Sequence, residues 1–107
     1  LLKALNIINE LVKKHHEKGV SYFNICITDG KRIVAFRSCT SPCIKPETMY
    51  FSVEEDPVQK ASKETIYKYI IIASEKLSTN NGFKWQIIPV NHCFMVEANL
   101  STSLQKL

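Results

Sequence analysis

The sequence predicts an α+β fold with antiparallel sheets, and three observations support this prediction. Residues 1–18 place apolar side chains at helical spacing. Short segments rich in β-branched and aromatic residues follow, and Asp29-Gly30 lies between the first two of them. An Asp-Gly pair at such a place favours a β-hairpin, because both residues tolerate positive φ. The chain has 107 residues, of which 45% are hydrophobic and 22% charged, as expected for one globular domain.

Residues 1–18 are expected to form one amphipathic helix. Its basic C-terminal end, Lys13 to Lys18, suits the negative end of the helix dipole, and Gly19 is the expected left-handed cap. Because one side of the helix is apolar, that side must pack against another part of the protein. This apolar stripe consists of Leu1, Ala4, Leu5, Ile8, Leu11 and Val12.

Several strands are expected after the helix. The run Tyr67–Ser74 is almost continuously apolar, which is typical of a strand covered on both faces, so we expect it at the centre of a sheet. Residues 54–65 are polar and charged and are expected to form a surface loop, and Asn80-Asn81-Gly82 a turn. Residues 99–107 give no signal. The expected strands are 22–28, 32–37, 49–53, 67–74 and 93–98, with a short segment at 85–88 that ends at Pro89.

Charge and composition narrow the class of protein. Fourteen basic and ten acidic side chains leave a net charge of +4, which is too small and too scattered to indicate nucleic-acid binding. The longest apolar run, Tyr69–Ala73, is much shorter than a membrane span. Residues 1–5 show neither an initiator Met nor a signal peptide, so we expect a cytoplasmic protein whose natural chain continues upstream of Leu1.

The cysteines are interpreted as structural. Cys26 and Cys93 lie in apolar runs and are expected in the core. A disulfide between Cys39 and Cys43 is geometrically possible but does not follow from their spacing, and reduced thiols are expected in the cytosol. A zinc site formed by Cys39, Cys43, His92 and Cys93 is disfavoured, because adjacent residues of a strand point to opposite faces.

Two further arrangements of reactive side chains give no site. The adjacent His15 and His16 point about 100° apart on a helix and cannot grip one ion together. A cysteine–histidine pair oriented by Glu75 lacks a thiol in the electropositive surroundings that lower its pKa. From the residues alone we therefore predict no catalytic, cofactor-binding or metal-binding residue in this chain.

Four segments, in their order along the chain, resemble the second half of the class II glutamine amidotransferases, which are N-terminal-nucleophile hydrolases. The resemblance covers nearly all of residues 1–96 and is greatest to the stand-alone enzymes of glutathione degradation and ergothioneine synthesis. It departs from that pattern where Lys76 replaces a proline and Met49 a leucine. The segments are Ser21–Arg37, Met49–Ser52, Ile70–Leu77 and Trp85–His92.

The resemblance implies a fold and a division of labour. The chain would be half of a four-layer αββα sandwich, with residues 1–107 forming the C-terminal part of a single amidotransferase domain whose N-terminal part is missing. The family's nucleophile is an N-terminal cysteine whose own amino group is the base, and no cysteine here matches it. Ser74 and Glu75 match the family's Ala-Ser-Glu signature and are expected to support the site, with no acid or nucleophile role.

The expected function is therefore a scaffold half of an amidohydrolase that acts on a γ-glutamyl amide. A non-catalytic binding or regulatory module with the same fold is the alternative. The expected partners are the missing N-terminal half, a second copy of the chain and, for the whole domain, a small γ-glutamyl molecule. Neither nucleic acid, membrane nor cofactor is expected, and the exact substrate and the ammonia acceptor stay open.

Overall fold

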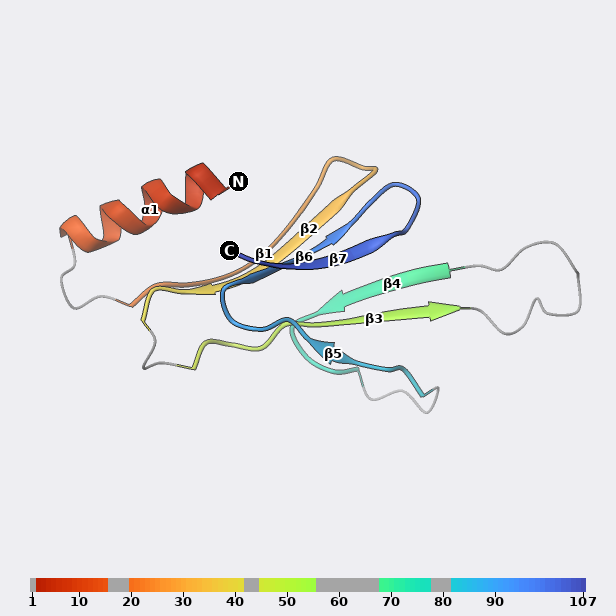
Figure 1. The fold of residues 1–107 in the computed structure, drawn as a ribbon. Helices are drawn as coiled ribbons and strands as arrows, with labels where there is room; N and C mark the ends of the chain where they lie inside the picture. Colours follow the sequence, from red (N-terminus) through yellow and green to blue (C-terminus); the bar gives the residue numbers. More distant parts are fainter. Residues whose placement is uncertain (1, 16–19, 42–44, 56–67, 78–81) are drawn as a thin grey trace, which may run out of the picture.

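The computed structural model describes residues 2–15, 20–41, 45–55, 68–77 and 82–107. These residues form one helix and two antiparallel sheets, which confirms the α+β prediction (Figure 1). The chain begins with the helix α1 (Leu2–His15). The strands are β1 (Tyr22–Thr28), β2 (Ile33–Cys39), β3 (Tyr50–Glu55), β4 (Lys68–Ala73), β5 (Gln86–Ile87), β6 (His92–Val96) and β7 (Thr102–Lys106).

Sheet A has the strand order β1-β2-β6-β7 and contains the predicted hairpin. β1 and β2 pair in register up to Thr28 opposite Ile33, so the connection is the four residues Asp29–Arg32. Only Gly30 takes a positive φ, at 84°. The Asp29 carboxylate accepts hydrogen bonds from the backbone N–H groups of Lys31 and Arg32, at 2.9 and 2.6 Å. The aspartate therefore closes the turn with its side chain.

The C-terminal tail adds a strand that the sequence did not predict. β7 pairs with β6 from Val96 opposite Thr102 to His92 opposite Lys106. Every residue of β7 is exposed, so its sequence shows no alternation of apolar and polar positions. The turn that leads into it depends on Leu100 at a φ of 62°, a conformation that leucine rarely adopts and sequence patterns do not mark.

Sheet B has the strand order β4-β3-β5, and this corrects two predictions. The run 67–74 was expected at the centre of a sheet, but β4 pairs with β3 alone among the described strands and its residues are half-buried or exposed. β3 takes the centre instead, with β5 on its other side. Glu54, expected in a loop, belongs to β3.

The hydrophobic core lies between the two sheets. The rings of Phe51 on β3 and Phe94 on β6 stack with their centroids 3.9 Å apart. Ala35 on β2 and Ile88, just after β5, are completely buried beside them. Because the sheets meet through these residues, each contributes one inner face to the core, as in other stacked antiparallel sheets.

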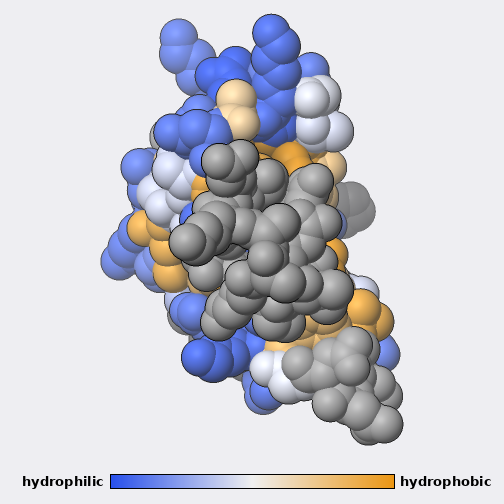
Figure 2. Space-filling model, turned by 90° about the vertical axis from the view of Figure 1, so that its right-hand side faces the viewer, coloured by the Kyte–Doolittle hydropathy of each residue, from blue (hydrophilic) through white to orange (hydrophobic). Residues whose placement is uncertain are grey.

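The outer surfaces are poorly covered for a domain of this size. The radius of gyration is 16.9 Å, whereas a compact chain of this length has about 13 Å. Viewed from the end where β4 begins, hydrophobic residues reach the surface between hydrophilic ones (Figure 2). The exposed large hydrophobic residues include Ile7, Ile8, Leu11, Tyr22, Ile27, Tyr69, Leu77, Ile87 and Leu104.

Several apolar residues of the helix are exposed to solvent. In Figure 1, α1 lies on the side of sheet A that faces away from sheet B. Its polar residues Asn6 and Asn9 line a hollow together with Ser38 on β2, while Ile7 and Leu11 are 60% and 53% exposed. The predicted helix thus forms, but the described part of its stripe is not buried, and Gly19 lies outside the described residues.

Replacing Phe94 with Ala tests the position of the core. Phe94 is 1% exposed, and truncating a buried phenylalanine costs about 3–5 kcal/mol through lost burial and the cavity left behind. We expect urea denaturation to show that the free energy of unfolding falls by this amount. Ile87→Ala is the control, because Ile87 is 43% exposed and should lose much less. Similar losses for the two variants would contradict the assignment of the core.

Candidate functional site

The strongest convergence of polar contacts surrounds Pro46–Met49, which we name the crossing segment because it leads the chain from sheet A to sheet B. Arg37 on β2 is only 3% exposed. Its guanidinium donates from Nε to the carbonyl of Glu47 at 2.7 Å, from Nη2 to that of Pro46 at 2.9 Å and from Nη1 to that of Ile88 at 3.0 Å. Three carbonyls thus accept hydrogen bonds from all three nitrogens of a buried cation, which offsets part of the cost of burying it.

Asn24 on β1 holds the same segment from another direction. Its Nδ2 donates to the carbonyls of Glu47 at 3.2 Å and Thr48 at 3.0 Å. Its Oδ1 is buried and accepts no hydrogen bond from the described residues. A buried acceptor of this kind is uncommon in a complete domain, where most buried polar atoms are paired.

The crossing segment also positions the end of β4. The Thr48 hydroxyl donates to the carbonyl of Ser74 at 2.8 Å, and the Ile88 N–H donates to the carbonyl of Met49 at 2.8 Å. Lys76 places its Nζ 5.3 Å from the ring centroid of Tyr50, within the range of a cation–π contact. All four segments of the resemblance therefore meet at Pro46–Met49, although they are spread over residues 21–92.

Ser74 and Glu75 lie where the sequence placed them, at the end of a strand. Both are exposed. Glu75 contributes an open carboxylate at the rim of sheet B, while the backbone of Ser74 is held by Thr48. The backbone of Ser74 meets the crossing segment. Neither side chain lines the hollows beside α1 and the β1–β2 hairpin.

The predictions for the burial of the cysteines were right in part. Cys93 is buried beside Phe36 on the outer face of sheet A, as predicted, whereas Cys26 is exposed and the prediction of a core position was wrong. Cys26 begins the exposed last part of β1, Cys26–Thr28, which its apolar neighbours do not reveal. Cys39 is buried and its Sγ donates to the carbonyl of Ser41 at 3.2 Å. Cys43, and with it the question of a disulfide, lies outside the described residues.

The histidines do not assemble with the thiols. The Nδ1 of His92 lies 2.9 Å from the carbonyl of Val90, and Cys93, its neighbour in β6, points to the opposite face as expected. His15 is exposed, and His16 lies outside the described residues. Among the described residues no group of three or more His, Cys, Asp or Glu side chains could hold a metal ion.

Two carboxylates have clearly shifted pKa values, and both serve structure. Hydrogen bonds from the backbone N–H groups of Arg32 and Lys31, followed by the Arg32 guanidinium, lower the pKa of Asp29 to about 2. The hydroxyl of Ser52 and the backbone N–H of Lys84 lower the pKa of Glu54. Glu54 thereby ties β3 to the residues before β5, and no sequence pattern predicts this contact because it spans 30 residues.

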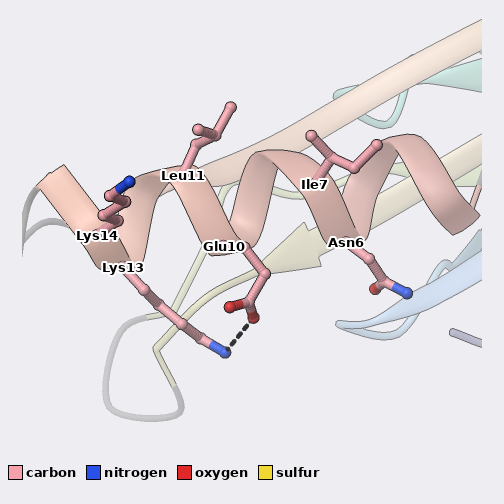
Figure 3. A pocket seen from close by; sticks show the side chains of 6 residues that line it. All are labelled: Asn6, Ile7, Glu10, Leu11, Lys13 and Lys14. Atoms are coloured by element: carbon pink, nitrogen blue, oxygen red, sulfur yellow. Dashed lines mark hydrogen bonds and ion pairs between the residues drawn. The ribbon is translucent and has the colours of Figure 1, made fainter.

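A shallow hollow of about 660 Å³ runs along α1 and is open to solvent (Figure 3). Ile7 and Leu11 stand on one side of the helix, and Glu10 and Lys13 form an ion pair of 3.1 Å on the other. No thiol or histidine lines this hollow. The surface suits contact with another apolar surface better than it suits catalysis.

Comparisons with protein-family models, with curated proteins and with solved structures find no match. Within the described residues, no helix has the length and apolar character needed to cross a membrane.

Replacing Arg37 with Met tests the crossing segment. The variant leaves three carbonyls without their donor, and each buried acceptor that stays unpaired costs about 1–3 kcal/mol. We expect urea denaturation to show that the free energy of unfolding falls by at least about 2 kcal/mol. Arg32→Met is the control, since the Arg32–Asp29 ion pair is exposed and such pairs contribute little. An Arg37 variant as stable as this control would contradict the role of the guanidinium.

The hairpin turn should respond to acid. The pKa of Asp29 is lowered from 3.8 to about 2 in the folded state. The stability that its ionised carboxylate gives to the turn is therefore fully present above pH 3.8 and is lost as the pH falls through 2. We expect NMR titration of the Asp29 carboxyl to show a midpoint near 2. In Asp29→Asn the order of the turn should not depend on pH in this range. A midpoint at 3.8 in the wild-type chain would show that the turn contacts are not formed.

Proposed function

We propose that the chain is the scaffold half of a glutamine amidotransferase-like amidohydrolase that acts on a γ-glutamyl amide. In this proposal a further segment of protein supplies the nucleophilic N-terminal cysteine. The observation that carries the proposal is the convergence at Pro46–Met49. The four segments of the resemblance are separate in sequence, yet the contacts of Arg37, Asn24 and Thr48 gather them at one place.

The chemistry of this convergence favours a supporting role. Arg37 and Asn24 donate to main-chain carbonyls and so hold the backbone in place. Arg37 is 3% exposed, which keeps it out of reach of a substrate. Such contacts hold a neighbouring site within the small tolerance that catalysis needs. The exposed Ser74 and Glu75 lie at the edge of this rigid region, where a completing half could build a site against them.

The outer faces of the sheets also support an incomplete layered domain. Large hydrophobic side chains on α1, β1 and β4 are exposed, among them Ile7, Ile27 and Tyr69. The buried, unpaired Oδ1 of Asn24 adds a polar position that a donor from another segment would satisfy. In a four-layer αββα sandwich, helices and further strands would cover these surfaces.

The proposal predicts how activity divides between the two halves. Residues 1–107 alone should release no ammonia from glutamine or from γ-glutamyl peptides, because their cysteines are internal. The full natural polypeptide should hydrolyse one of these amides and should react with a glutamine-like electrophile at its N-terminal cysteine. The measurements are ammonia release and mass-spectrometric mapping of the labelled residue.

A pair of variants distinguishes residues that support the proposed site from residues that matter only for folding. In the full polypeptide, Thr48→Val removes the bond to the Ser74 carbonyl and should lower kcat about tenfold by loosening the site. Thr102→Val, on the exposed β7, should change nothing. Activity of residues 1–107 that disappears on mutating a cysteine to Ala would show that the site lies in this chain. A full polypeptide that binds γ-glutamyl compounds without cleaving them would support the non-catalytic module.

A further inference from the structure

The sequence and the position of β4 disagree. Residues 69–73 read Tyr-Ile-Ile-Ile-Ala, a composition typical of a strand with neighbours on both sides and cover on both faces. In the structure β4 is the first strand of sheet B and pairs with β3 through six consecutive residues, without a bulge. Its other edge has no strand beside it among the described residues.

β4 also lacks the features with which proteins usually protect an edge. Such features are charges, prolines, bulges or very short strands. The only charged residue of β4 is Lys68, its first, and Tyr69 is 40% exposed. Of the other sheet ends, β5 has only two residues, and β7 is polar and ends in Lys106. β1 is also uncharged, so the experiment below distinguishes its edge from that of β4.

We propose that β4 pairs antiparallel with β4 of a second copy of the chain, so that two copies of sheet B form one continuous sheet of six strands. An extended strand is the only element that can satisfy a row of unpaired backbone N–H and C=O groups. A second copy is a suitable source, because β4 is apolar along its length and can match itself.

The two-fold symmetry fixes the possible registers. An antiparallel pair of identical strands has its axis perpendicular to the sheet, so each residue must face one that lies on the same face. With Ile71 on the axis, Ile70 lies opposite Ile72 of the second copy and Tyr69 opposite Ala73. The core-facing row of Ile70 and Ile72, which packs against the hydrophobic core, then continues from one copy into the next.

Neighbouring registers are less favourable. A shift that puts Ile72 on the axis leaves only residues 71–73 opposite β4 residues of the second copy, because β4 ends at Ala73. A shift that puts Ile70 on the axis places Lys68 opposite Ile72, on the core side. With Ile71 on the axis, Lys68 lies opposite the exposed Ser74, where its amine stays in water.

This pairing goes beyond the proposed function and does not depend on it. If the completing half of the proposed domain instead adds a strand at the edge of β4, the full polypeptide will not crosslink through Ile71→Cys, although residues 1–107 alone will. Strand pairing is read from mass and crosslinking, and the proposed function from amide hydrolysis, so either can fail while the other holds.

Disulfide trapping tests the pairing and its register. Cys26 is exposed, so the experiment uses a Cys26→Ser background. Directly opposite residues have Cβ atoms about 5 Å apart, close enough for a disulfide after a small adjustment. Ile71→Cys should therefore form a covalent dimer under mild oxidation. Ile87→Cys on β5 should crosslink far less, although Ile87 is exposed and Ile71 only half-buried.

A second pair of variants checks the register. Tyr69→Cys alone should crosslink no better than Ile87→Cys, while a mixture of Tyr69→Cys and Ala73→Cys should give the mixed dimer. Light scattering on the unmodified chain should show twice the monomer mass at micromolar concentrations. Ile71→Lys should halve that mass, and Ile87→Lys should leave it unchanged.

Three outcomes would overturn the proposal. One is a monomer at all concentrations with the circular dichroism of a folded β-protein. Another is a dimer that Ile71→Cys traps no better than Ile87→Cys. The third is a dimer trapped through the natural Cys26 in the unmodified chain, which would assign the pairing to β1.

Discussion

The buried guanidinium of Arg37 is the interaction on which the arrangement of the two sheets depends. The chain passes between the sheets twice, between β2 and β3 and between β5 and β6. Arg37 binds carbonyls in both passages, at Pro46 and Glu47 in the first and at Ile88 in the second. A buried cation is costly unless its donors are used, and five N–H groups in a planar fork suit several carbonyls at once. The stacked rings of Phe51 and Phe94 then fill the space between the sheets that these bonds hold together.

Local features of the fold could be predicted from the sequence. The helix and the β1–β2 hairpin depend on spacing and on Asp29-Gly30, which lie within a few residues of each other. The Arg37 contact could not be predicted, because its carbonyl at Ile88 is 51 residues away and an arginine in a strand usually points to solvent. β7 was missed for a different reason, since a fully exposed strand needs only backbone pairing and leaves no pattern in its side chains.

The candidate site was predictable only in part. Ser74 and Glu75 lie at a strand end, as their match to a signature suggested, and Cys93 is buried. Asn24 and Thr48 act through main-chain carbonyls of a connection without regular structure, which no spacing rule marks. Cys26 and β4 show the opposite error. Their apolar neighbours suggest burial, yet burial depends on what lies across the sheet. Among the described residues Cys26 is exposed and β4 is at most half-buried.

Amide hydrogen exchange on residues 1–107 tests the central claim most directly, because the claim is that Arg37 makes the two sheets one cooperative unit. The Ile88 N–H, bonded to the Met49 carbonyl at 2.8 Å, belongs to sheet B, and the amides of Ala35 and Phe94 belong to sheet A. We expect these amides to exchange with the same free energy of opening and to lose protection together in Arg37→Met. Protection of Ala35 and Phe94 with fast exchange at Ile88 in the wild-type chain would contradict the claim.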